Sequence, residues 1–212
     1  MYHKTTLDNG IKIISCHMPH MKSVALGLWV SAGGRYERED RSGISHFIEH
    51  LLFKGTKNRS GQEIKEAIEG VGGALNAFTS EEFTGYFVKV VEKYFKLSLE
   101  VLSDMFLNPL FNDGDMEKER LVILEEIRMY LDLPLQYVHQ LLYELLWPNQ
   151  PLGRNLAGTP ESMQAMKRDE VINYHQSLYH PARLVIAVAG AVKHDLIVKS
   201  VKDIFSKIKP RS

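Results

Sequence analysis

The alternation of apolar and polar residues predicts strands near both ends of the chain and in its middle. Residues 2–17 alternate on either side of Asn9-Gly10, a dipeptide suited to the positive φ angles of a tight hairpin turn. The more continuously apolar stretch "SVALGLWVSAG" at 23–33 indicates a central strand covered on both faces. Further strands are expected where β-branched and aromatic residues gather, at 74–80, 83–91 and 183–190.

Apolar residues spaced three and four apart predict helices over most of the remaining chain. Ser42 is a candidate N-cap for a helix over 42–53, because a serine hydroxyl accepts hydrogen bonds from free backbone amides. The other expected helices cover 60–73, 92–107, 113–132, 135–146, 160–166, 168–178 and 193–208. This order predicts an α+β fold in which residues 1–212 form one domain, with helices packed on a largely antiparallel sheet.

Composition narrows the possible classes of protein. Lys plus Arg equals Asp plus Glu at 26 each, so no charge excess suggests binding to nucleic acid or to a membrane surface. The single cysteine, Cys16, excludes an internal disulfide and a cysteine-rich metal site, and it fits a reducing compartment. Neither a signal peptide nor a membrane-spanning run is evident, so we expect a cytoplasmic protein, or a mitochondrial matrix protein whose transit peptide has been removed.

The stretch "GISHFIEHLLFKGT" at 43–56 concentrates metal-binding side chains on one helix face. His46 and His50 are four residues apart, so both imidazoles can reach a single Zn²⁺ ion at about 2.0–2.1 Å. Glu49 lies beside that face and could take a proton from a water on the metal, as in other H-x-x-E-H sites. The alternative is a structural pair of histidines on a half-exposed face.

A catalytic zinc site needs a third protein ligand, and the helix predicted over 113–132 offers several glutamates. Glu119 and Glu126 are seven residues apart and therefore share a face. Leu121 and Val122 are among the apolar residues expected to flank that face and to bury Glu126 partly. The alternative is a solvated acidic stripe paired with neighbouring basic residues.

Three segments together resemble the pitrilysin family of zinc peptidases, which includes the mitochondrial processing peptidase and insulin-degrading enzyme. They are "GISHFIEHLLFKGT", "LNAFTSEEFTGYF" and "EKERLVILEEIRMY", with 76 residues from His50 to Glu126; the processing-peptidase-like branch is the most similar. The segments 151–162 and 179–190 also match. The resemblance implies that His46, His50 and Glu126 bind Zn²⁺, that Glu49 is the general base, and that Glu119 is an auxiliary carboxylate.

The resemblance also implies how substrate binds. In this family an extended peptide adds to the edge of the strand that here contains Asn76, Ala77 and Phe78, so main-chain hydrogen bonds provide affinity. Phe53 and Phe78 are candidates for a pocket that takes substrate side chains. The alternative for the strand is an ordinary edge strand, with Asn76 in a turn. The alternative for the two phenylalanines is that they belong to the core.

Members of the family generally carry two homologous halves that close around the substrate, and these residues match the first half. We therefore expect a zinc endopeptidase that hydrolyses extended peptides or presequence-like segments. A complementary half, either a partner subunit or further residues of a longer chain, would be needed for full activity. The alternative is a non-catalytic peptide-binding or scaffold half of a heteromeric peptidase.

Overall fold

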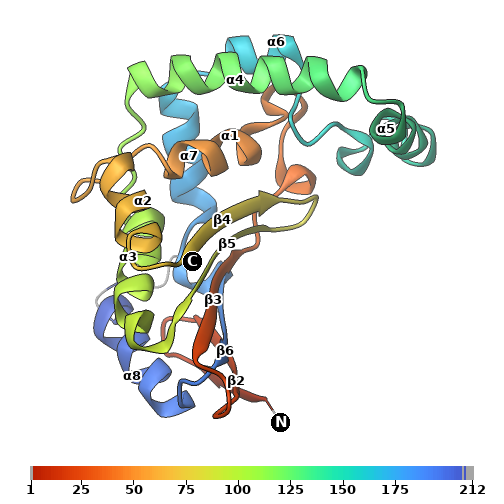
Figure 1. Ribbon diagram of the computed structural model, residues 1–212. Helices are drawn as coiled ribbons and strands as arrows, with labels where there is room; N and C mark the ends of the chain where they lie inside the picture. The colour runs from red at the N-terminus through yellow and green to blue at the C-terminus, as the bar shows by residue number, and fades with distance from the viewer. Residues whose placement is uncertain (1, 207, 209–212) are drawn as a thin grey trace.

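The computed structural model describes residues 2–206 and 208, which form a mixed sheet with helices on one side (Figure 1). The strands pair in the order β1-β2-β6-β3-β5-β4, and β4 forms one edge of the sheet. Their bounds are β1 His3–Thr6, β2 Lys12–His17, β3 Ser23–Val30, β4 Ala74–Thr79, β5 Thr84–Val91 and β6 Leu184–Gly190. Among the strand pairs of the described residues, β2 with β6 alone is parallel, so the predicted α+β class and largely antiparallel sheet are confirmed.

The helices follow the predicted periodicity closely. Their bounds are α1 Ile44–Leu52, α2 Gly61–Glu69, α3 Phe95–Leu107, α4 Asp113–Leu131, α5 Pro134–Leu146, α6 Pro160–Ala165, α7 Arg168–Leu178 and α8 His194–Phe205. The predicted range 193–208 is too long, because α8 ends at Phe205 and residue 208 is in a bend; residue 207 lies outside the described residues.

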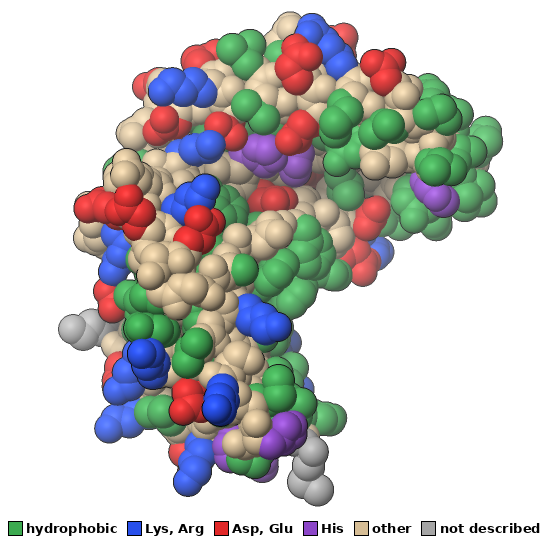
Figure 2. Space-filling model, in the orientation of Figure 1, with side chains coloured by type: hydrophobic (Ala, Val, Ile, Leu, Met, Phe, Trp, Pro, Cys, Tyr) green, Lys and Arg blue, Asp and Glu red, His purple; other side chains and the backbone are tan. Residues whose placement is uncertain are grey.

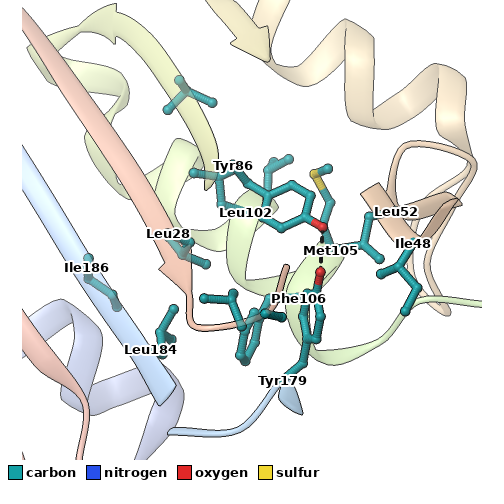
Figure 3. Packing of buried hydrophobic residues seen from close by; sticks show 14 of the residues in the cluster. Leu28, Ile48, Leu52, Tyr86, Leu102, Met105, Phe106, Tyr179, Leu184 and Ile186 are labelled. Atoms are coloured by element: carbon teal, nitrogen blue, oxygen red, sulfur yellow. Dashed lines mark hydrogen bonds between the residues drawn. The ribbon is translucent and has the colours of Figure 1, made fainter. Parts of the chain in front are cut away.

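The core lies between the sheet and the helices α3 and α8. Leu28 and Ile186 point from the sheet toward Leu102 and Phe106 of α3 (Figure 3). The hydroxyl groups of Tyr86 and Tyr179 are 2.9 Å apart, so these two buried polar groups satisfy each other.

The face of the sheet that points away from α3 and α8 is open. The expectation that the strand predicted at 23–33 is covered on both faces is therefore wrong. Val24, Leu26, Leu28 and Val30 of β3 are buried, whereas Ala25 is exposed and Trp29 is half-buried. Trp29 meets Phe78 and Phe83 edge to face on this open side, with ring centroids 5.6 and 5.7 Å apart. The side chains of this central strand therefore point alternately to the core and to the open face.

Helices α1 and α4 stand beyond the β4 edge, with α4 crossing above α1 (Figure 1). Beneath α4, histidine and acidic side chains lie together in a hollow, and hydrophobic side chains gather over α5 (Figure 2). No residue of α5 is buried, and Leu135 and Leu145 are 83% and 79% exposed.

Candidate metal centre

Helix α1 presents its three motif residues on the side away from its core contacts. Phe47, Ile48, Leu51 and Leu52 are at most 1% exposed, so packing sets the rotation of the helix about its axis. His46, Glu49 and His50 therefore lie together on the face turned toward α4 and β4, and each of them is half-buried.

The N-terminus of α1 is capped by Glu37, and the prediction that Ser42 is the N-cap is wrong. The N-cap position is Gly43, at φ 90°, and an added Cβ there would lie 2.5 Å from the carbonyl oxygen of Ala157. The buried Glu37 carboxylate accepts hydrogen bonds from the amides of Gly43 and Ser45, both at 2.8 Å. Burial raises the pKa of Glu37, although these hydrogen bonds oppose the shift.

Helix α4 brings two glutamates to the histidines of α1. Ile123 and Ile127 are buried, and they orient α4 so that Glu119 and Glu126 face α1. Glu126 is partly buried as predicted, its side chain 30% exposed. Two of the predicted flanking residues, Leu121 and Val122, point instead to solvent, 65% and 44% exposed.

His46, His50 and Glu126 form the group of described residues whose donor atoms are arranged to hold a metal ion. The two Nε2 atoms are 3.2 Å apart, and Glu126 Oε2 lies 3.8 Å from Nε2 of His46 and 3.7 Å from Nε2 of His50. Ligands at about 2.0–2.1 Å from a tetrahedral zinc ion are about 3.3 Å from one another. The three atoms thus fit one face of such a tetrahedron, and a His₂Glu set leaves the fourth corner for water or substrate.

The electrostatic surroundings suit metal binding by neutral imidazole. Burial lowers the pKa of His46 to about 4, with a further contribution from the neighbouring His50. A neutral ring offers the nitrogen lone pair that a metal requires. Nδ1 of His46 is buried and has no hydrogen-bond partner among the described residues.

Glu49 is held by a residue that the sequence did not single out. Its Oε2 accepts a hydrogen bond from Thr79 Oγ1 at 2.6 Å, and Thr79 is the last residue of β4. Burial raises the pKa of Glu49, while the bond from Thr79 opposes that shift. A raised pKa makes a carboxylate a better proton acceptor, and the same group can return the proton later in the reaction.

Glu119 lies behind the histidines, and its carboxylate has two partners. Its Oε2 is 3.1 Å from Nδ1 of His50, and its Oε1 is 2.6 Å from Nζ of Lys54. Sequence reasoning missed Lys54; its position four residues after His50 was the one available signal.

The predicted substrate residues lie at the free edge of β4. The Oδ1 of Asn76 accepts a hydrogen bond from the amide of Ala77 at 2.8 Å, and Phe78 is 38% exposed. Phe78 lines a cavity of about 500 Å³ that also reaches His46, Glu49 and Tyr137 of α5. Phe53 is not part of this lining and packs partly against the core.

Comparisons with known proteins give the family of the chain. The family model described as insulinase (peptidase family M16) matches residues 12–160, and the model described as peptidase M16 inactive domain matches 165–212.

Among the described residues, no helix has the length and apolar character needed to cross a bilayer.

Curated relatives and solved structures agree with this match. The chain is 40% identical over 205 residues to the uncharacterized zinc protease YmxG of Bacillus subtilis, covering 97% of this chain and 50% of that protein. It is 37% identical to a probable mitochondrial-processing peptidase subunit beta of Arabidopsis thaliana, covering 96% of this chain and 38% of that protein. The crystal structure of a protease from Helicobacter pylori superimposes with a TM-score of 0.95 at 25% identity, covering 100% of this chain and 51% of that one.

The chain therefore spans half, or less, of the length of these relatives. Several relatives are named zinc proteases, and these names agree with the group of possible metal ligands that α1 and α4 bring together. The chain belongs to the insulinase family of zinc peptidases, peptidase family M16.

Proposed function

We propose that residues 1–212 form the metal-binding half of a zinc endopeptidase, with His46, His50 and Glu126 as ligands and Glu49 as the general base. The observation that carries the proposal is the close approach of two imidazole nitrogens and a carboxylate oxygen, with a second, half-buried carboxylate beside them. When bound, zinc polarises the scissile carbonyl and lowers the pKa of a coordinated water.

Glu49 accepts the proton of the attacking water and later returns it to the leaving amine. Thr79 keeps the Glu49 carboxylate turned toward β4, the strand along which a peptide would lie. An extended substrate adds to the free edge of β4 near Asn76 and Ala77, and Phe78 offers an apolar surface for a side chain.

A complementary half completes the peptidase. Two observations support it: the chain covers about half of the length of its relatives, and one face of its sheet is open with Trp29 and Phe78 partly exposed. That half would bury the open face and contribute further groups that position substrate, because positioning supplies much of the rate of an enzyme. The compartment in which the protein works stays a prediction.

Two substitutions test the assignment in the peptidase assembled with its complementary half. We expect Glu49→Gln to keep zinc and to lower peptide hydrolysis at least about 100-fold, because a general base typically contributes that much or more. Glu126→Gln should lose zinc and activity together. Glu125→Gln is the matched control, because Glu125 is adjacent in sequence but its side chain is 68% exposed and pairs with Arg128.

Metal content is measured by atomic emission and hydrolysis with fluorogenic peptides. A Glu49→Gln enzyme with near wild-type turnover would remove Glu49 as the base. Wild-type protein that binds zinc but stays silent with its complementary half present would identify it as a scaffold instead.

A further inference from the structure

Lys54 extends the candidate metal centre by one residue beyond its predicted members. Its Nζ lies 2.6 Å from Oε1 of Glu119, whose other oxygen is 3.1 Å from Nδ1 of His50. One carboxylate thus bridges a cation and a histidine whose opposite nitrogen faces His46 and Glu126.

The burial of Glu119 makes its partner important. The Glu119 side chain is 9% exposed, whereas that of Lys54 is 39% exposed. A carboxylate so far removed from water needs hydrogen bonds on both oxygens, because an unpaired buried charge is costly. Among the described residues, Lys54 is the one lysine or arginine that forms an ion pair with Glu119.

The backbone of Lys54 is fixed from both sides. Its amide donates to the carbonyl of Leu51 at 3.1 Å at the end of α1. Two residues later, Thr56 donates through Oγ1 to the buried Asp104 at 2.6 Å. The side chain of Lys54 therefore starts from a fixed backbone position, and only its own rotamer freedom is lost when Nζ reaches Glu119.

The two histidines differ in what orients them. Nδ1 of His46 has no hydrogen-bond partner among the described residues, so packing holds that ring. Nδ1 of His50 can donate to Glu119, which fixes the tautomer and turns Nε2 toward His46 and Glu126. A carboxylate in this role commonly contributes about 10- to 100-fold to metal affinity.

From these contacts we propose that Lys54 is a positioning residue of the metal centre, which acts through Glu119 to hold the His50 ring in its metal-binding orientation. The inference rests on the proposed function only in taking His50 as a ligand. It predicts that the contribution of Lys54 to zinc binding disappears when Glu119 can no longer serve as a carboxylate bridge.

A double-mutant cycle tests this directly. Zinc dissociation constants are measured by competition with a chromophoric chelator for wild type, Lys54→Met, Glu119→Gln and the double variant. We expect Lys54→Met to weaken zinc binding about tenfold in the wild-type background and less than about twofold in the Glu119→Gln background. Lys54→Arg, which retains a cation, should recover most of the loss.

Lys57→Met is the matched control, since Lys57 lies in the same connection after α1 and is also exposed, whereas the ion pairs of Glu119 are with Lys54 and His50. It should bind zinc like wild type. The metal-free melting temperatures of all variants are measured alongside, because removing the partner of a buried carboxylate lowers stability, and zinc dissociation constants are compared at a temperature where every variant is folded.

The proposal is overturned if Lys54→Met binds zinc as tightly as wild type, or loses the same factor in both backgrounds, or is not rescued by Lys54→Arg. If the proposed function itself were wrong, wild type would not bind zinc, or Glu126→Gln would bind it normally. The two failures can therefore be told apart.

Discussion

The three polar residues on the site-facing side of α1 meet partners from two other elements, α4 and β4. His46 faces Glu126 of α4, Glu49 accepts from Thr79 of β4, and His50 is bridged through Glu119. Glu49 is therefore tied to the strand that would carry the substrate, while both histidines are tied to α4. This separation keeps a carboxylate beside the metal donors without making it one of them.

Replacing Thr79 with Val should move the acidic limb of kcat/KM to higher pH. Burial raises the pKa of Glu49 and the hydroxyl of Thr79 counteracts it, so loss of that bond raises the pKa further. A base must be ionised, so a higher pKa means that activity appears only at higher pH. We expect a shift of about one pH unit, the scale of one hydrogen bond to a charged group.

The shift is measured from pH–rate profiles of the assembled peptidase. Thr79→Ser retains a hydroxyl and should keep the wild-type profile. Identical acidic limbs for wild type, Thr79→Ser and Thr79→Val would contradict the role given to this hydrogen bond.

At the scale of elements, the metal centre depends on how α1 begins and on how α4 crosses it. Glu37 supplies the acceptors for the first amides of α1, and its negative charge at a helix N-terminus is favourable whenever it is ionised. Its own main-chain carbonyl accepts from Arg154, so the segments before and after the metal helix are joined at this point.

Glu37→Ala should lower the free energy of unfolding by about 2 kcal/mol, because the amides of Gly43 and Ser45 lose their buried acceptors. Glu39→Ala is the control, since Glu39 is exposed, and it should change stability by less than about 0.5 kcal/mol. Urea unfolding followed by circular dichroism measures both. Equal midpoints for the two variants would show that Glu37 does not cap α1.

At the scale of the whole molecule, the proposed ligands come from two helices separated by about a third of the chain, at His46, His50 and Glu126. A bound ion would therefore link α1 to α4. One face of the sheet is open, and α5 has no buried residue. Two surfaces near the candidate metal centre are therefore poorly covered by the rest of the protein.

Zinc at 100 times its dissociation constant should stabilise the folded protein by about 2.7 kcal/mol, which raises the melting temperature by about 5–10 °C for a chain of this size. Differential scanning calorimetry with zinc and with a chelator measures the difference. Glu126→Gln should abolish the shift, whereas Glu125→Gln should retain it. A full shift in Glu126→Gln would mean that the ion binds elsewhere.

Local pattern was enough to predict the class of the fold and to bring His46 and His50 together on one helix face. Alternation and helical spacing placed most strands and helices within a few residues, because these periods are properties of the local backbone. The spacing of His46 and His50 put two imidazoles on one face for the same reason. The resemblance to a known family then singled out Glu126 among several glutamates of one helix.

The tertiary structure decided what depends on contacts between distant segments. The parallel pairing of β2 with β6, the open face beside Trp29 and the capping of α1 by Glu37 all require knowing which elements lie side by side. No periodicity marks Thr79, and Lys54 has only its spacing from His50; both residues matter because of the carboxylates they contact. Periodicity encodes which side of an element faces the core, whereas the partner of each side chain is set only when the elements pack.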